Sequence, residues 1–165
     1  MILDIGCGFP NPSEPYLKRG DIGVDTKRGY ADIIADAHSL PFRDGAFTRI
    51  NVYSTLDHLA EPYKALTEAY RVTTDELILE VGNCEFWAYS FNQASPLHLY
   101  QWSRWTLRQL LEKIGFTDIS VTPLTLNTYQ GSKWEQVYHV ACSLYPADRC
   151  VWFNAEILHV EAKKC

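Results

Sequence analysis

An apolar run that ends in Gly-x-Gly opens the chain: Leu3-Asp4-Ile5-Gly6-Cys7-Gly8. Such a run predicts a buried strand followed by a tight turn, because glycine tolerates positive φ and lets a ligand approach the backbone closely. Two more short apolar runs follow at 22–24 and 33–35, and a carboxylate, Asp25 or Asp36, comes directly after each. In an open α/β sheet, ligands bind beyond the carboxyl ends of the strands. The pattern therefore predicts an α/β fold with a ligand site at these three turns.

The spacing of these residues indicates a nucleoside. Asp25 lies 19 residues after Gly6, close to the spacing of roughly 20 residues at which a carboxylate reaches the hydroxyls of a ribose. Asp36 and the backbone N–H of Ala37 suit the exocyclic amine and a ring nitrogen of adenine, which need one acceptor and one donor.

The same residues indicate an amine rather than a phosphate. Asn11 stands where a dinucleotide fingerprint has its third glycine, and the chain has no phosphate-loop motif. Asp4, just before the glycines, suits an ammonium group better than a diphosphate. S-adenosylmethionine, which joins adenosine to an amino acid without any phosphate, fits these features best.

Residues 2–81 resemble a class I S-adenosylmethionine-dependent methyltransferase of the small-molecule branch called type 11, and the likeness continues more loosely through 105–116. Phe9-Pro10-Asn11 departs from the glycine that the family usually has in its first motif. The matching motifs occur in the family's order: Leu3-Asp4-Ile5-Gly6-Cys7-Gly8, Gly23-Val24-Asp25, Ala35-Asp36-Ala37, Leu40-Pro41-Phe42-Arg43-Asp44-Gly45-Ala46-Phe47, Leu56-Asp57-His58-Leu59 and Ala65-Leu66-Thr67-Glu68-Ala69-Tyr70-Arg71-Val72.

This resemblance implies an α/β fold, a Rossmann-like three-layer sandwich around a mostly parallel seven-stranded sheet with the last strand antiparallel. It implies S-adenosyl-L-methionine as the cofactor. The cofactor-binding residues that it implies are Asp4, Gly6, Cys7, Gly8, Asp25, Thr26, Asp36, Ala37 and Ser54.

Length, composition and charge limit the classes of protein to which the chain can belong. With 165 residues, of which 47% are apolar and 21% charged, the chain suits one globular domain, 1–165. A net charge of −5 argues against nucleic acid as the main partner. No secretory signal or membrane-length apolar run is visible, so we expect a cytoplasmic protein without membrane association. The five cysteines lack metal-ligand spacing, so we expect reduced thiols and no metal site.

Alternating strand and helix patterns predict the elements of a mostly parallel sheet. Helices are expected at 13–19, from Pro62 to Val72, and from the N-cap Ser103 to the terminating Gly115. The stretch 132–145 fits either a helix or a strand, and we favour a helix. Strands are expected at 2–5, 21–24, 31–35, 48–53, 76–82, 117–124 and 154–162.

Methyl transfer needs no fixed catalytic motif, because its leaving group is already good and the protein mainly aligns the acceptor. The stretch Asn51-Val52-Tyr53-Ser54 lacks the prolines of DNA adenine methyltransferases, so we expect no DNA substrate. His58 is the candidate general base, since its ordinary pKa suits proton removal near neutrality. A structural role for His58, through a hydrogen bond that positions its loop, is the alternative.

Aromatic residues crowd the segment 83–105, which we interpret either as a lid with an acceptor pocket or as a loop that covers the core. The chain begins at its first strand, so we expect a domain without the family's usual N-terminal helix. A homodimer through the aromatic segment would then close the site.

Three functions remain open from the sequence. The first is an S-adenosylmethionine-dependent methyltransferase that acts on a small-molecule acceptor. The second is a non-catalytic S-adenosylmethionine-binding or partner subunit. The third is a protein or RNA methyltransferase that docks its substrate through Arg104 and Arg108.

Overall fold

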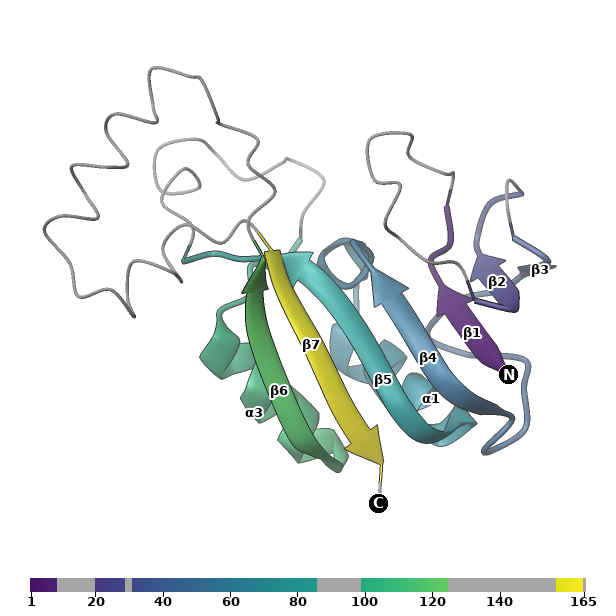
Figure 1. The fold of residues 1–165 in the computed structure, drawn as a ribbon. Helices are drawn as coiled ribbons and strands as arrows, with labels where there is room; N and C mark the ends of the chain where they lie inside the picture. Colours follow the sequence, from purple (N-terminus) through teal and green to yellow (C-terminus); the bar gives the residue numbers. More distant parts are fainter. Residues whose placement is uncertain (9–19, 29–30, 86–98, 125–156, 165) are drawn as a thin grey trace, which may run out of the picture.

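A computed structural model describes residues 1–8, 20–28, 31–85, 99–124 and 157–164 of the chain (Figure 1). Seven strands form one sheet in the order β3-β2-β1-β4-β5-β7-β6. The strands are β1 (Ile2–Ile5), β2 (Ile22–Asp25), β3 (Ile33–Ile34), β4 (Phe47–Tyr53), β5 (Thr73–Gly82), β6 (Phe116–Leu124) and β7 (Ile157–Lys164). The helices are the single 3-10 turn η1 (Leu56–His58), α1 (Pro62–Val72) and α3 (Arg104–Ile114).

The sheet confirms the predicted α/β topology. Strands β1 to β5 pair in parallel, whereas β7 runs antiparallel to both of its neighbours, β5 and β6. The strand order reverses at β1, which lies between β2 and β4. This reversal creates the crevice at the carboxyl ends of the strands where open α/β sheets bind ligands.

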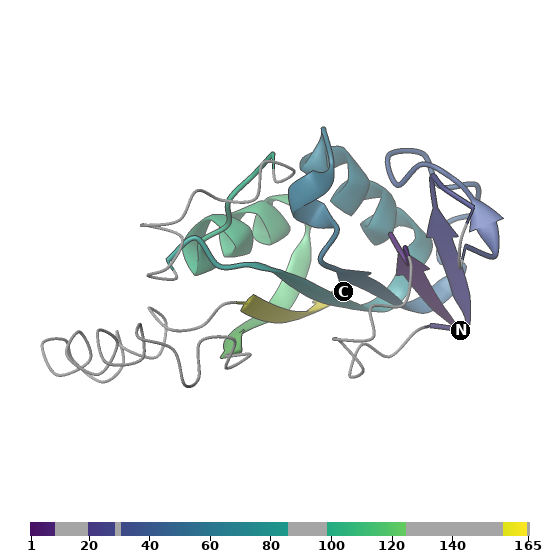
Figure 2. The same cartoon turned by 90° about the horizontal axis from the view of Figure 1, so that it is seen from above.

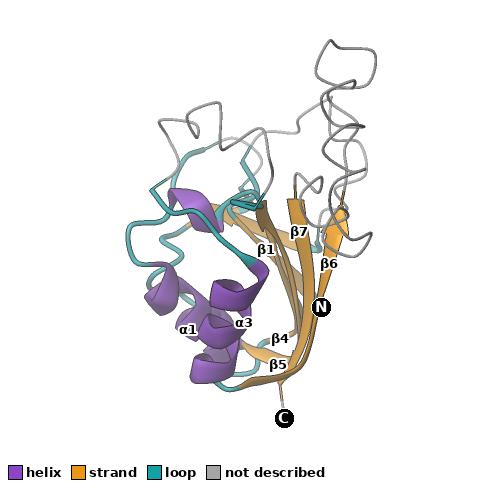
Figure 3. Cartoon of the chain, turned by 90° about the vertical axis from the view of Figure 1, so that its left-hand side faces the viewer, coloured by secondary structure: helices purple, strands orange, loops and turns teal. Residues whose placement is uncertain are grey.

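Local sequence explains both long helices. Pro62 occupies the first turn of α1, where its missing N–H costs nothing. Ser103 caps α3 by accepting a hydrogen bond from the Thr106 N–H, and Gly115 ends it in the left-handed conformation at φ 118°. Both predicted helices are therefore confirmed with their bounds. They lie on the same face of the sheet (Figures 2 and 3).

The two faces of the sheet differ in chemistry, because successive side chains of a strand point to opposite sides. Leu3, Ile50 and Leu77 are neighbours across β1, β4 and β5, and all three are completely buried in the hydrophobic core. On the opposite face Asp4 and Asn51 are neighbours, and both are almost completely buried. That face is therefore polar although it is buried.

A second polar pair lies on the same face. Glu80 of β5 faces His159 of β7, with 2.8 Å between the carboxylate oxygen and Nδ1. The hydrogen bond to Glu80 raises the pKa of His159 above its usual 6.5, and the more exposed Glu161 adds to the effect. A raised pKa means that protonated His159 stabilises the folded state.

The free energy of unfolding should therefore decrease as the pH rises and His159 loses its proton. We expect its contribution, about 1 kcal/mol for a partly exposed charge pair, to be complete below pH 6.5 and lost as the pH rises through the raised pKa. Urea unfolding between pH 5.5 and 9 would measure this slope. Glu80→Gln should flatten it and Glu161→Gln should change it less, because Glu161 is mostly exposed. An unchanged slope in Glu80→Gln would contradict the assignment.

Some predicted elements differ from the structure. The strand predicted at 31–35 is only two residues long in the sheet, and that predicted at 76–82 begins at Thr73, directly after α1. The predicted last strand is β7, which is described only from Ile157. The helices predicted at 13–19 and 132–145 lie outside the described residues. The second helical layer of the predicted three-layer sandwich is not seen among the described residues and stays a prediction.

Candidate functional site

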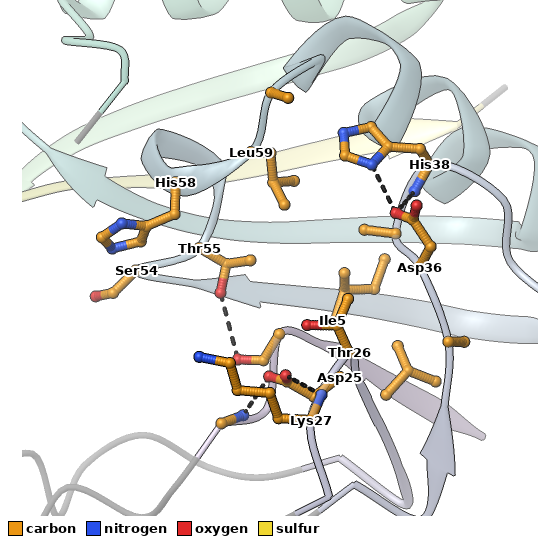
Figure 4. Close-up of a pocket in the computed structure, with 16 residues that line it drawn as sticks. Ile5, Asp25, Thr26, Lys27, Asp36, His38, Ser54, Thr55, His58 and Leu59 are labelled. Atoms are coloured by element: carbon orange, nitrogen blue, oxygen red, sulfur yellow. Dashed lines mark hydrogen bonds and ion pairs between the residues drawn. The ribbon is translucent and has the colours of Figure 1, made fainter. Parts of the chain in front are cut away.

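A cavity of about 730 Å³ lies at the carboxyl ends of β1, β2 and β4, which is a volume typical of sites for small organic ligands (Figure 4). It combines apolar walls with two carboxylates and two imidazoles. Its lining consists of Ile5, Gly6, Gly8, Val24, Asp25, Thr26, Lys27, Ala35, Asp36, Ala37, His38, Ser54, Thr55, His58, Leu59 and Ala60.

The glycine turn after β1 forms one wall of the cavity. Gly6 and Gly8 both adopt positive φ, 72° and 43°. The Gly6 N–H donates to the Val24 carbonyl over 2.9 Å, which ties the turn to β2. A Cβ at Gly6 would lie 2.3 Å from the side chain of Thr55, so only glycine fits between the turn and the segment after β4.

Asp25 ends β2 with its carboxylate in the cavity. One oxygen accepts a hydrogen bond from the Gly8 N–H and the other from the Lys27 N–H, each over 3.0 Å (Figure 4). Because each carboxylate oxygen has two lone pairs, both oxygens retain one for a ligand. Asp25 thus joins the glycine turn to β2 and offers two fixed acceptors to a ligand with adjacent hydroxyls.

Asp36 lies after β3, and His38 holds its carboxylate. One oxygen, Oδ1, accepts from the backbone N–H of His38 over 2.9 Å and faces its Nδ1 at 2.6 Å. These two hydrogen bonds, the backbone one foremost, keep the pKa of Asp36 below its usual value. Asp36 is therefore a carboxylate near neutral pH, with a fixed orientation at the rim of the cavity.

The segment after β4 forms the opposite wall. Ser54, with φ 45°, turns the chain there, and its N–H donates to the Glu80 carbonyl over 2.9 Å. Thr55 Oγ1 donates to the carbonyl of Tyr53 over 2.8 Å. His58 is exposed, lies at the end of η1 and lines the cavity together with Ser54. The structure thus brings the candidate base into the same cavity as the two carboxylates.

Most of the predicted site residues meet at this cavity, and two do not. Asp4 is 5% exposed and lies on the polar face of the sheet, because it alternates with Leu3 and Ile5. Its carboxylate accepts hydrogen bonds from the Gly20 N–H and, over 2.7 Å, from Asn51 Nδ2. These hydrogen bonds give Asp4 a structural role, and its predicted contact with the cofactor stays a prediction. Cys7 also does not line the cavity.

Eight lining residues were not predicted as site residues: Ile5, Val24, Lys27, Ala35, His38, Thr55, Leu59 and Ala60. His38 had a detectable signal, since a histidine two residues after a carboxylate can reach that carboxylate in a tight turn. Thr55 had none, because its contact with Gly6 joins segments that are remote in the sequence.

Only 83–85 and 99–105 of the predicted aromatic lid are described. Trp102 is 7% exposed and belongs to the core, as the alternative interpretation of this segment requires. Tyr100 is partly exposed, and Trp105 is 61% exposed. The lid and the homodimer stay predictions. Among the described residues, no helix is both long enough and apolar enough to span a bilayer.

Residues 3–76 match the family described as a methyltransferase domain. A demethylmenaquinone methyltransferase of Renibacterium salmoninarum is 35% identical over a region covering 44% of this chain and 36% of that enzyme. The matched region thus spans about a third of the length of this relative.

Two solved structures show the same fold. A SAM dependent methyltransferase from Archaeoglobus fulgidus has a TM-score of 0.71 at 20% identity, covering 99% of this chain and 85% of that one. A Haemonchus contortus phosphoethanolamine N-methyltransferase in complex with S-adenosyl-L-methionine has a TM-score of 0.65 at 14% identity, covering 99% and 48%. The sheet, the cavity and the family match over residues 3–76 thus agree in their likeness to the class I S-adenosylmethionine-dependent methyltransferases of the type 11 branch.

Proposed function

We propose that the chain is an S-adenosylmethionine-dependent methyltransferase that acts on a small organic acceptor. The observation that carries the proposal is the pair of carboxylates, Asp25 and Asp36, that follow adjacent strands and line one cavity with the glycine turn. Two carboxylates would repel a phosphate, whereas they accept hydrogen bonds from a ribose and an adenine amine.

The lining of the cavity offers groups that suit each part of this cofactor. Asp25 would accept from the ribose hydroxyls, while Asp36 and the Ala37 backbone would pair with adenine. Ile5, Val24 and Leu59 provide apolar walls for the rings. Gly6, Gly8, Thr26 and Ser54 would surround the remainder of the cofactor, in the positions implied by the family resemblance.

When bound, S-adenosylmethionine would supply a methyl group on a sulfonium, to be transferred to the acceptor's lone pair with S-adenosylhomocysteine as the leaving group. The task of the chain's own residues would be to hold both reactants in line. His58 lines the same cavity, and we assign it the role of a base that accepts the acceptor's proton.

The acceptor is proposed from the relative and from a second hollow. The matched enzyme of Renibacterium salmoninarum is named for demethylmenaquinone, which makes this the first acceptor to test. A hollow of about 510 Å³ between α1 and α3 shares Ala60 with the main cavity. Tyr63, Tyr100 and Trp102 line it, and such aromatic walls suit a flat apolar molecule.

Asp25→Asn should weaken cofactor binding by about tenfold to a hundredfold, since a hydrogen bond to a charged group contributes about 1.5–3 kcal/mol. Isothermal titration with S-adenosylhomocysteine would measure the affinity. Asp118→Asn is a matched control, because Asp118 is an exposed residue of β6 with φ 47°, a conformation that asparagine tolerates. Equal affinity in the Asp25 variant and the wild type would show that the ribose lies elsewhere.

Transfer of a labelled methyl group to a cell extract separates the proposed function from its alternatives. Label in small molecules, and in demethylmenaquinone when it is added, supports the proposal. Label in protein or RNA would instead indicate the macromolecular methyltransferase. Binding of the cofactor without any transfer would indicate a non-catalytic subunit.

A further inference from the structure

The carboxylate of Asp36 is held asymmetrically. Both hydrogen bonds from His38, one from its backbone N–H and one from its ring, end on the same oxygen, Oδ1 (Figure 4). Among the described residues, no hydrogen bond to Oδ2 is observed. The side chain of Asp36 is 60% exposed at the cavity, so its second oxygen is available to a ligand in a fixed direction.

The other side of the His38 ring is held as well. Its Nε2 accepts a hydrogen bond of 3.2 Å from the backbone N–H of Glu61, the residue before α1. A ring whose Nε2 accepts carries its proton on Nδ1, the atom that faces Asp36. The imidazole is 16% exposed and therefore bridges the turn after β3 and the start of α1 with both nitrogens engaged.

We propose that His38 is a positioning residue that makes the cavity selective for a 6-aminopurine, an inference that rests on the proposed function. By fixing Oδ1, His38 presents Oδ2 of Asp36 as an acceptor, and the 6-amino group of adenine is a donor. A 6-oxopurine would place a carbonyl oxygen against the same carboxylate and leave it without a donor. Because the carboxylate is oriented before the ligand arrives, binding does not have to immobilise it.

A purely structural role for His38 is the alternative, in which the ring only fastens α1 to the turn. Two substitutions separate the roles, because each keeps a polar atom near the place of one of the two ring nitrogens. The amide nitrogen of His38→Asn lies near the place of Nδ1 and can still donate to Asp36. The amide oxygen of His38→Gln lies near the place of Nε2 and can still accept from the Glu61 N–H.

Titration with S-adenosylhomocysteine and with its deaminated 6-oxo analogue, S-inosylhomocysteine, tests the proposal. We expect wild type and His38→Asn to prefer the adenine compound by about tenfold or more, as for one hydrogen bond to a charged group. In His38→Gln we expect that preference to fall by about tenfold, through weaker binding of the adenine compound alone. Stability should rank the two variants the other way. His38→Asn loses the hydrogen bond from the Glu61 N–H, so it should have a lower melting temperature than His38→Gln.

The outcomes distinguish a failure of this inference from a failure of the proposed function on which it rests. Full preference for adenine in a folded His38→Gln would overturn the role of His38 and leave the proposed function intact. Equal binding of both compounds to the wild type would do the same. Failure of the wild type to bind either compound would overturn the proposed function and this inference together.

Discussion

Gly6→Ala is expected to destabilise the folded protein by about 3 kcal/mol or more. Two costs combine at this position. At φ 72° an L-residue loses about 1–2 kcal/mol, and the new Cβ would lie 2.3 Å from Cγ2 and Oγ1 of Thr55. Relieving such an overlap in a packed site costs about 1–3 kcal/mol. Urea unfolding followed by circular dichroism would measure the loss.

Gly8→Ala is the matched control. Gly8 also has positive φ, but the nearest atom to an added Cβ is the Gly6 carbonyl oxygen at 3.8 Å. We therefore expect only the conformational cost, about 1–2 kcal/mol. Adding Thr55→Gly to Gly6→Ala should restore the part of the stability lost to the overlap. Equal losses in the two alanine variants would show that Thr55 does not confine the turn.

Arg71→Lys is expected to cost about 2–4 kcal/mol, because the arginine joins α1 to the turn before β4 with all five of its N–H groups. Two hydrogen bonds of 2.8 Å reach the carboxylate of Glu68, and the others reach the carbonyls of Leu40 and Phe42 and the carboxylate of Asp44. A lysine cannot reproduce this planar fork, so carbonyls lose their partners. Denaturant unfolding would measure the change.

Arg43→Lys makes the same substitution in the same turn, at an exposed position. We expect a change of about 0.5 kcal/mol or less, as for most surface substitutions. The hydrogen bonds from Arg71 also lower the pKa of Glu68. The stability that they add should thus be present above pH 4.5 and decline as the pH falls through the lowered pKa. Equal losses of stability in Arg71→Lys and Arg43→Lys would show that the five hydrogen bonds of Arg71 do not stabilise the fold.

The sheet and both long helices could be predicted because their signals are local. Each apolar run became a strand, and Ser103 and Gly115 bound α3 as their capping preferences predict. The place of Asp4 on the buried polar face of the sheet could not be predicted in the same way. A strand of four residues, closely followed by glycines, does not reveal which residues face the ligand and which face the far side of the sheet.

The candidate site was predictable only in part for a similar reason. Asp25 and Asp36 follow apolar runs, so their place at the strand ends could be inferred. The contacts that orient them could not, because they depend on tertiary neighbours: Thr55 against Gly6, and Glu61 against His38. Arg71 belongs to a motif that the resemblance identified, yet its five hydrogen bonds reach residues up to 31 positions away.

Calorimetric titration of the wild-type chain with S-adenosylmethionine and S-adenosylhomocysteine tests the central claim most directly. The cavity with its two oriented carboxylates predicts binding of both compounds with a Kd well below millimolar, which corresponds to more than about 4 kcal/mol of binding free energy. It also predicts weaker binding to Asp25→Asn. Failure of both compounds to bind a folded chain at millimolar concentration would contradict the assignment of this cavity as the cofactor site.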